Sequence, residues 1–370
     1  MSATIHTTGY ARLNSWQARG VLCLLVALIV SGMAITLSST ASGFVGVQRP
    51  GPSDAELYEA TARRVHAGEA YYLAMADELR QRGYPTQSIF NWRTPMPMWL
   101  IGMMPQWAMG KWLLCGLAGL LLMLAFEWLA REGGVRAAVV GTLLMTGPLM
   151  FCVLGNKFVM PVVWAGVLIG LSLCALGLGR TRLGVAAGIA AVFCRELAGP
   201  FCALMLLLAI IRRRRGEAIR WTIGLACYAI YFLYHMQQVA TCMPRDGVAH
   251  GEGWLQLGGA AFVISTVQMN AYLLLSPQWV AVVVLVLSLL GFAGWHSPAA
   301  ERAGLTVAAY MAMFAIIGHD FNQYWGALMA PAICLGFAWA SASVRDLWQT
   351  AQMGTPLSQP LRLDQLPLDR

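Results

Sequence analysis

Long apolar blocks alternate with short polar segments along most of the chain. Residues 21–37, 112–129 and 278–293 contain one charged side chain between them, Glu127. A helix that crosses a bilayer needs about 20 mostly apolar residues, so these blocks fit or nearly fit a membrane span. Apolar and polar residues do not alternate within the blocks, as they would in a membrane barrel. Since the backbone must satisfy its own hydrogen bonds in lipid, the pattern predicts helices.

The succession of blocks predicts an all-α, polytopic membrane protein with about ten spanning or half-spanning helices. We expect residues 1–350 to form a single transmembrane domain. Residues 351–370 contain no hydrophobic periodicity and are expected to be a disordered cytoplasmic tail. The longest polar stretch lies in the first outer loop, 42–110, where helical spacing and the glycines after it predict juxtamembrane helices over 54–66 and 70–82.

Two apolar segments are too short or too interrupted for ordinary spans. Residues 95–108 contain three prolines and have a tryptophan near each end, which favours a half-inserted or interfacial helix. Residues 183–193 and 197–211 are both short, and basic residues flank the pair on its outer sides. We therefore expect a hairpin with Arg195 and Glu196 at its tip, where buried charges pair or face an aqueous cavity.

Residues 257–275 contain Ser265, Gln268 and Asn270 within an otherwise apolar stretch. These polar positions favour an amphipathic helix on the outer surface, and a membrane span is the alternative. Later apolar blocks predict helices over about 278–295, 303–318 and 323–342.

Composition supports the membrane assignment. Hydrophobic residues make up 58% of the chain and charged residues 11%, against about 25% charged in soluble domains. The formal net charge is +8, but the basic residues cluster at predicted helix ends, as in Arg131, Arg136, Arg180, Arg182 and Arg212–Arg215. This positive-inside pattern places both termini in the cytoplasm and explains the charge without a nucleic-acid partner. No pattern indicates an oligomeric state.

The nine cysteines form no CxxC pair, and most lie inside apolar blocks. They are expected to be buried thiols rather than a disulfide framework. No spacing typical of a metal site, such as HExxH, occurs in the chain.

With this topology the unusual polar residues fall at one face of the membrane. A random distribution would divide them between the two faces, so their convergence predicts a functional site at the outer face. The residues concerned are Asp54, Glu69, Arg93, Lys157, Arg195, Glu196, His319, Asp320 and Tyr324.

The first outer loop reads SDAELYEATARRVHAGEAYY, with an acidic residue just after the first helix and a tyrosine four positions later. A Gly-x-x-Tyr stretch follows at Gly68–Tyr71, then a proline-rich segment at 94–97 and, late in the chain, FNQYWGALMAP. This order resembles the GT-C superfamily of membrane glycosyltransferases, which use polyprenyl-phosphate-linked sugars. The chain departs from that superfamily in having no second acidic residue in the loop at Asn156 and Lys157, and no large C-terminal outer domain.

The resemblance implies an inverting glycosyltransferase in a bacterial inner membrane, active at its periplasmic or extracellular face. Asp54 would be the general base that accepts a proton from the acceptor hydroxyl. Arg93, Arg195 and Lys157 would bind the donor phosphate, which gains charge as it leaves. The resemblance also allows a divalent metal as a cofactor. The partners would be the polyprenyl-phosphate-linked sugar and membrane lipid. The residues implied in substrate binding are Tyr58, Glu69, Tyr71, Tyr72, Trp92, Glu196, His319, Asp320 and Tyr324.

Structural interpretations of the same residues remain open. Ser53 to Glu56 also match a capping box, in which Asp54 would favour a helix N-terminus. Arg195 and Glu196 could be a salt bridge that closes the hairpin tip, and His319 and Asp320 a solvated helix end. Trp92 fits an interfacial belt as well as a sugar-stacking surface.

Two other functions are consistent with broken helices and outer loops. A transporter or flippase of lipid-linked glycans would use polar residues near the middle of the membrane and internal repeats, and neither is evident in this chain. A glycan polymerase would also use arginines in outer loops, but it would not need Asp54.

Overall fold

The computed structural model describes residues 7–41, 53–244 and 256–353, and this part of the chain is mostly helical. Helices account for 82% of it and no strand occurs within these ranges, so the prediction of an all-α protein is confirmed. The α-helices are α1 (Ser15–Ala41), α2 (Asp54–His66), α3 (Tyr71–Gln81), α4 (Met96–Gly102), α5 (Trp107–Leu149), α6 (Pro161–Gly177), α7 (Thr181–Cys194), α8 (Gly199–Ile211), α9 (Arg215–Cys242), α10 (Gly259–Val267), α11 (Ala271–Leu274), α12 (Gln278–Gly294), α13 (Pro298–Ile316), α14 (Ala330–Phe337) and α15 (Ala340–Gln352).

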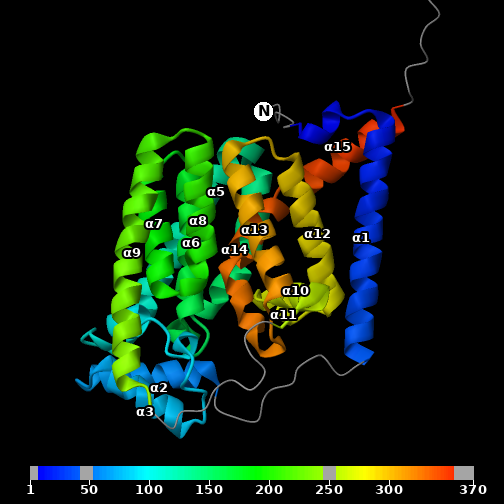
Figure 1. Ribbon diagram of the computed structural model, residues 1–370. Helices are drawn as coiled ribbons and strands as arrows, with labels where there is room; N and C mark the ends of the chain where they lie inside the picture. The colour runs from blue at the N-terminus through cyan, green and yellow to red at the C-terminus, as the bar shows by residue number, and fades with distance from the viewer. Residues whose placement is uncertain (1–6, 42–52, 245–255, 354–370) are drawn as a thin grey trace, which may run out of the picture.

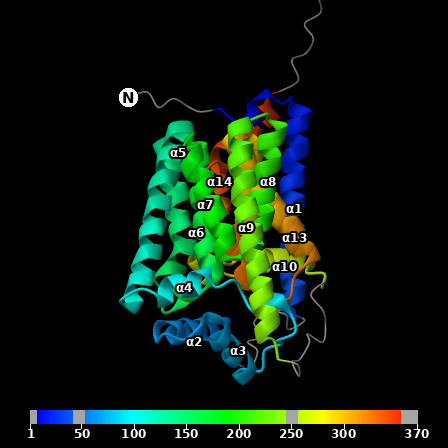
Figure 2. The ribbon, with the colours of Figure 1, turned by 60° about the vertical axis from the view of Figure 1, so that its left-hand side comes forward.

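The long helices stand side by side in a bundle, with two short helices across one end (Figure 1). Helices α2 and α3 lie across the end of the bundle where α9 ends, as Figure 2 also shows; α3 contacts α9, and α2 contacts α4. Helix α15 lies at the opposite end, where it contacts α1. We name these the loop end, with α2 and α3, and the basic end, with the Arg212–Arg215 turn between α8 and α9.

The two helices expected in the first outer loop are present as α2 and α3. Ser53 caps α2: its Oγ accepts from the Glu56 amide at 3.4 Å, and its own amide donates to Glu56 Oε2 at 3.3 Å. These two contacts satisfy orphan amides at the helix start, as a capping box does. The box therefore leaves the carboxylate of Asp54 available for other partners.

Helix α5 contains a break at Gly134. Gly134 has φ 78° and ψ 173°, a conformation that is essentially open only to glycine. The break therefore separates two helical segments.

The two irregular segments predicted from the sequence are also irregular in the structure. Residues 95–108 form only the seven-residue helix α4 before α5 begins at Trp107. Helices α7 and α8 form the expected hairpin, and the short 3-10 helix η5 (Glu196–Ala198) lies at its tip. Thr94 Oγ1 donates to the Phe193 carbonyl at 3.2 Å and so ties the start of α4 to that tip.

Residues 257–275 differ from the expected single surface helix. They form α10 and α11, and α10 is buried against α12, α13 and the 3-10 helix η6 (Asp320–Leu328). The polar residues that suggested a water-facing side are bound inside the protein instead. Asn270 Nδ2 donates to the Leu144 carbonyl at 3.2 Å, and Gln268 Oε1 accepts from Gln323 Nε2 at 3.5 Å.

The late helix expected over 323–342 is divided as well. Its residues are shared between η6, α14 and α15, and the chain bends by 56° between Phe321–Leu328 and Ala330–Gln352. Residues 351 and 352, expected in the tail, complete α15; the rest of the predicted tail, 354–370, lies outside the described residues.

Among the described residues, two helices are long and apolar enough to cross a membrane. They are Ser15–Ser38 and Trp107–Cys152, with the bent pair as a third candidate. Four further apolar helices have 10–17 residues: Pro161–Gly177, Thr181–Cys194, Glu196–Ile211 and Gln278–Gly294. The larger number of spans expected from the sequence stays a prediction.

Candidate functional site

Asp54 is the first residue of α2, and two tyrosine hydroxyls donate to its carboxylate. Tyr84, from the segment after α3, donates to Oδ1 at 2.9 Å, and Tyr324, from η6, donates to Oδ2 at 2.7 Å. A carboxylate has about four lone-pair positions, so these two bonds leave about two free. Asp54 therefore keeps acceptor capacity for a further hydrogen-bond donor.

The tyrosines around Asp54 are held in their neutral, donating form. Burial and the Asp54 charge raise the pKa of Tyr84 above its usual range. Burial also raises the pKa of Tyr58, which lies within electrostatic reach of Asp54 and Arg195. Tyr58 accepts a hydrogen bond from Arg93 Nε at 2.8 Å, so it connects the carboxylate to the first arginine of the site.

Two buried arginines share one carboxylate beside Tyr58. Glu196 Oε1 lies 3.3 Å from Arg195 Nη1 and 3.9 Å from Arg93 Nη1. The side chain of Arg195 is 3% exposed, and its Nε has no hydrogen-bond partner among the described residues. An unpaired buried donor costs free energy unless a ligand or water satisfies it. Arg195 therefore has donor capacity that an anionic ligand can use.

The backbone at Arg93 is strained. Its φ is 51°, in the left-handed region that residues other than glycine rarely adopt. Tyr71, which is buried, holds the segment by donating its hydroxyl to the carbonyls of Trp92 at 2.8 Å and Arg93 at 3.0 Å. Strain of this kind persists only where the surroundings enforce it, and it often occurs at functional sites. Tyr71 therefore positions Arg93.

Six of the residues singled out from the sequence come together at the loop end. They span 271 positions of the chain, from Asp54 to Tyr324, and are contributed by α2, the segment before α4, the hairpin tip and η6. We name this set the Asp54 cluster: Asp54, Tyr58, Arg93, Arg195, Glu196 and Tyr324.

The remaining predicted residues lie outside this cluster. Glu69 is bound by Arg64, with Nη2 and Oε1 2.5 Å apart, and so closes the turn between α2 and α3. Trp92 is fully buried and donates to the Thr86 carbonyl at 2.9 Å, which gives it a core position rather than a stacking surface. Lys157 is exposed in the 3-10 helix η4 (Lys157–Val159), beside α2.

Tyr72 and His319 are also buried outside the cluster. The hydroxyl of Tyr72 forms a hydrogen bond with Nδ1 of His235, on α9, at 3.1 Å. The His319 ring stacks on Phe321 with 5.0 Å between centroids, so it is not a solvated helix end. Asp320 is the first residue of η6.

Sequence reasoning missed Tyr84, which binds Asp54 directly. The sequence around Tyr84 gave little indication of this role, because Tyr84 lies between Gly83 and Pro85, a pattern that indicates only the end of a helix. His235 was also missed, because a lone histidine in an apolar helix has no spacing that marks it.

Within the described ranges no group of three or more His, Cys, Asp or Glu side chains is placed to hold a metal ion. Asp54 and Glu196 belong to different parts of the Asp54 cluster and have tyrosine and arginine partners.

Removing the two hydroxyl donors should weaken the site without unfolding the protein. We expect Tyr84→Phe and Tyr324→Phe each to lower the rate of the sugar transfer that the resemblance implies about tenfold. Each substitution removes a hydrogen bond to a charged group, which contributes roughly 1.5–3 kcal/mol. Initial rates and thermal unfolding of the purified variants would measure this. Tyr272→Phe removes a hydroxyl that pairs with Thr146 instead, so it should keep full activity. Equal rates for all three variants would show that the hydrogen bonds of Tyr84 and Tyr324 to Asp54 do not contribute to the reaction.

Comparison of the chain with protein-family models, with curated proteins and with solved structures finds no match.

Proposed function

We propose that the chain is a polytopic membrane glycosyltransferase that transfers a sugar from a polyprenyl-phosphate donor to an acceptor hydroxyl with inversion. The observation that carries this proposal is the Asp54 cluster, which combines a carboxylate with free acceptor capacity and two buried arginines. A base and a phosphate-binding group are the two elements that this reaction requires.

Side-chain exposure supports the membrane placement. The apolar span of α1 is only 11% buried inside the protein. Leu24, Val26, Val30 and Leu37 are each more than half exposed along it. An exposed apolar surface of this length is unfavourable in water and favourable in lipid. The short apolar helices of the bundle would then lie within the membrane as half-spans or tilted spans.

The distribution of arginines supports the orientation. The turn at Arg212–Arg215 lies at the basic end, while the Asp54 cluster lies at the loop end (Figure 1). Basic residues favour the cytoplasmic side of a membrane. The cluster would therefore face the periplasm or the cell exterior, where polyprenyl-linked sugars are presented by their lipid.

The proposed reaction is a single displacement. Asp54 accepts the proton of the acceptor hydroxyl while the hydroxyl oxygen of the acceptor forms a bond to the sugar C1. The bond between C1 and the phosphate oxygen breaks, and polyprenyl phosphate leaves with that electron pair. Arg195 and Arg93 stabilise the additional charge on the phosphate, because guanidinium groups can donate two parallel hydrogen bonds to it.

A reconstituted system tests this proposal. Wild-type protein in liposomes would be mixed with polyprenyl-phosphate-linked hexoses and pentoses that carry a labelled sugar, with a membrane extract as the source of acceptors. We expect labelled sugar to leave its lipid, and the product to have the opposite anomeric configuration. Labelled donor that crosses the bilayer with its sugar still attached would overturn the proposal and favour a transporter.

A further inference from the structure

The basic end contains a pocket that is separate from the Asp54 cluster. It has a volume of about 460 Å³ and lies where the turn after α6 meets the first turns of α9. Its lining residues come from the start of α7 and from α9. They are Gly179, Arg180, Thr181, Arg182, Leu183 and Arg220, and we name the site the arginine pocket.

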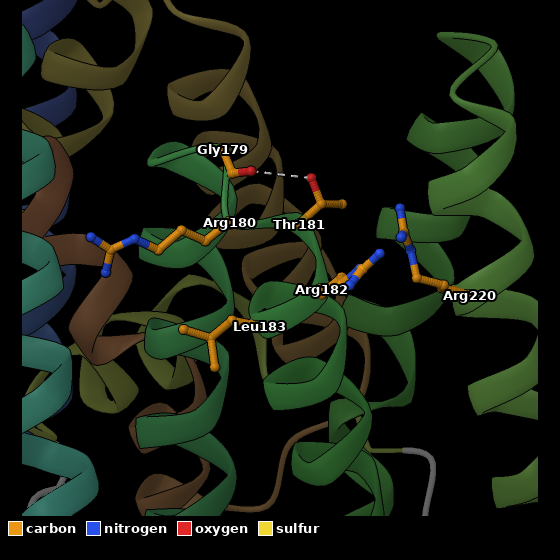
Figure 3. A pocket seen from close by; sticks show the side chains of 6 residues that line it. All are labelled: Gly179, Arg180, Thr181, Arg182, Leu183 and Arg220. Carbon is orange, nitrogen blue, oxygen red and sulfur yellow. Dashed lines mark hydrogen bonds between the residues drawn. The ribbon is translucent and has the colours of Figure 1, made fainter.

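Two of its arginines extend toward the same space. Figure 3 shows the side chains of Arg182 and Arg220 pointing toward one another, whereas Arg180 points away. Arg180 is neutralised by Glu127, with Nη2 and Oε2 2.9 Å apart. In the described part of the chain, Arg182 and Arg220 have no ion-pair or hydrogen-bond partner, and Arg220 Nε is buried and unpaired. Two like charges that converge without an acid repel one another unless an anion lies between them.

Exposed apolar side chains flank Arg220 along α9, and Leu183 lines the pocket itself. Ile219 and Ile223, one turn apart, are 59% and 58% exposed, and Leu183 is 40% exposed. An anion with hydrocarbon chains would bury these side chains, whereas a free anion would leave them uncovered. The arrangement is therefore that of a lipid site, with a charged headgroup position beside an apolar surface.

We infer that the arginine pocket binds the phosphate headgroup of an anionic membrane lipid. Arg182 and Arg220 bind the phosphate oxygens, and the chains lie along Ile219 and Ile223. The first turn of α7 adds the favourable end of its helix dipole. Basic pockets between membrane helices at a cytoplasmic face bind anionic headgroups on the same physical basis. The inference rests on the membrane placement proposed above and is independent of sugar transfer.

Lipid-dependent stability of the purified protein tests this inference. Phosphatidylglycerol, phosphatidylcholine and inorganic phosphate would be added separately to detergent-solubilised protein, and the thermal unfolding midpoint recorded against concentration. We expect only phosphatidylglycerol to raise the midpoint of the wild type. The double variant Arg182→Gln/Arg220→Gln should need at least about tenfold more lipid for the same shift, because it removes both charged donors to the phosphate.

A matched variant controls for charge. Arg136→Gln/Arg215→Gln removes two exposed arginines outside the pocket and should respond to lipid as the wild type does. An equal response from both double variants would overturn the inference, as would an equal shift with phosphatidylcholine. A shift of the same size with inorganic phosphate would show that the pocket binds a free anion, and would overturn the inference that it binds a lipid. No sugar donor is present in this experiment, so its failure leaves the glycosyltransferase proposal standing.

Discussion

Asp54→Asn is expected to lower the rate of sugar transfer about 10²–10⁴-fold, the range typical of removing a general base. An amide has the shape of the carboxylate but cannot accept the acceptor's proton. Its nitrogen also cannot accept a hydrogen bond, so either Tyr84 or Tyr324 loses its partner. Helix α2 should remain folded, because Ser53 and Glu56 form its cap. Initial rates with saturating donor would measure the effect.

Asp77→Asn is the matched control for this substitution. Asp77 lies in α3, its side chain is 49% exposed, and it pairs with Arg64 rather than with the cluster. It should keep nearly full activity, since exposed ion pairs contribute roughly 0–1 kcal/mol to stability. An Asp54→Asn variant with more than half of the wild-type rate would exclude Asp54 as the base. A similar loss in both variants would indicate a structural role for the whole loop.

Arg302→Met is expected to reduce the free energy of unfolding by about 3–5 kcal/mol, because it leaves a buried carboxylate without its main partner. At the basic end, Arg302 Nη2 donates to Glu217 Oε2 at 3.0 Å, and Nη1 lies 2.8 Å from Oε1. The two side chains are 2% and 4% exposed, and they join α13 to α9. Arg214, at 3.6 Å, would neutralise Glu217 only in part because it is half exposed. Unfolding by sodium dodecyl sulfate in mixed micelles would measure the loss.

The double variant Arg302→Met/Glu217→Leu should recover most of this stability. Replacing both members of a buried pair by apolar residues of similar size removes the unpaired charge and its desolvation cost. Arg131→Met is the exposed control: the Arg131 side chain is 61% exposed, it contacts Glu127 one turn earlier in α5, and its loss should cost no more than about 1 kcal/mol. A double variant as unstable as Arg302→Met would show that the pair acts through packing instead.

Local sequence signals predicted the helices of the first outer loop closely. Ser53 and Glu56 mark the start of α2, and Gly68 the turn before α3, because capping and glycine conformation depend on neighbours in the chain. The short segments around α4 and the α7–α8 hairpin were predictable for the same reason. The length and proline content of a segment limit how long a helix it can form, whatever packs against that helix.

Contacts between distant segments were only partly predictable. Placing the polar residues at one face brought Asp54, Arg93 and Arg195 into the same candidate site. It could not indicate that Glu69 binds Arg64 instead, because such a choice depends on side-chain geometry. Hydrophobic periodicity likewise predicted that Asn270 faces water. In the structure its side-chain amide is buried, and its hydrogen-bonding requirement is met by the Leu144 carbonyl.

The hydrogen bond between Tyr324 and Asp54 has a consequence for biosynthesis. Its two residues are separated by 270 positions, so a nascent chain exposes Asp54 long before its partner has been translated. The carboxylate that we propose as the general base therefore acquires its full environment only after the ribosome has passed η6. A chain that stops before Tyr324 would lack the hydroxyl that donates to Asp54 Oδ2, and its Asp54 cluster would be incomplete.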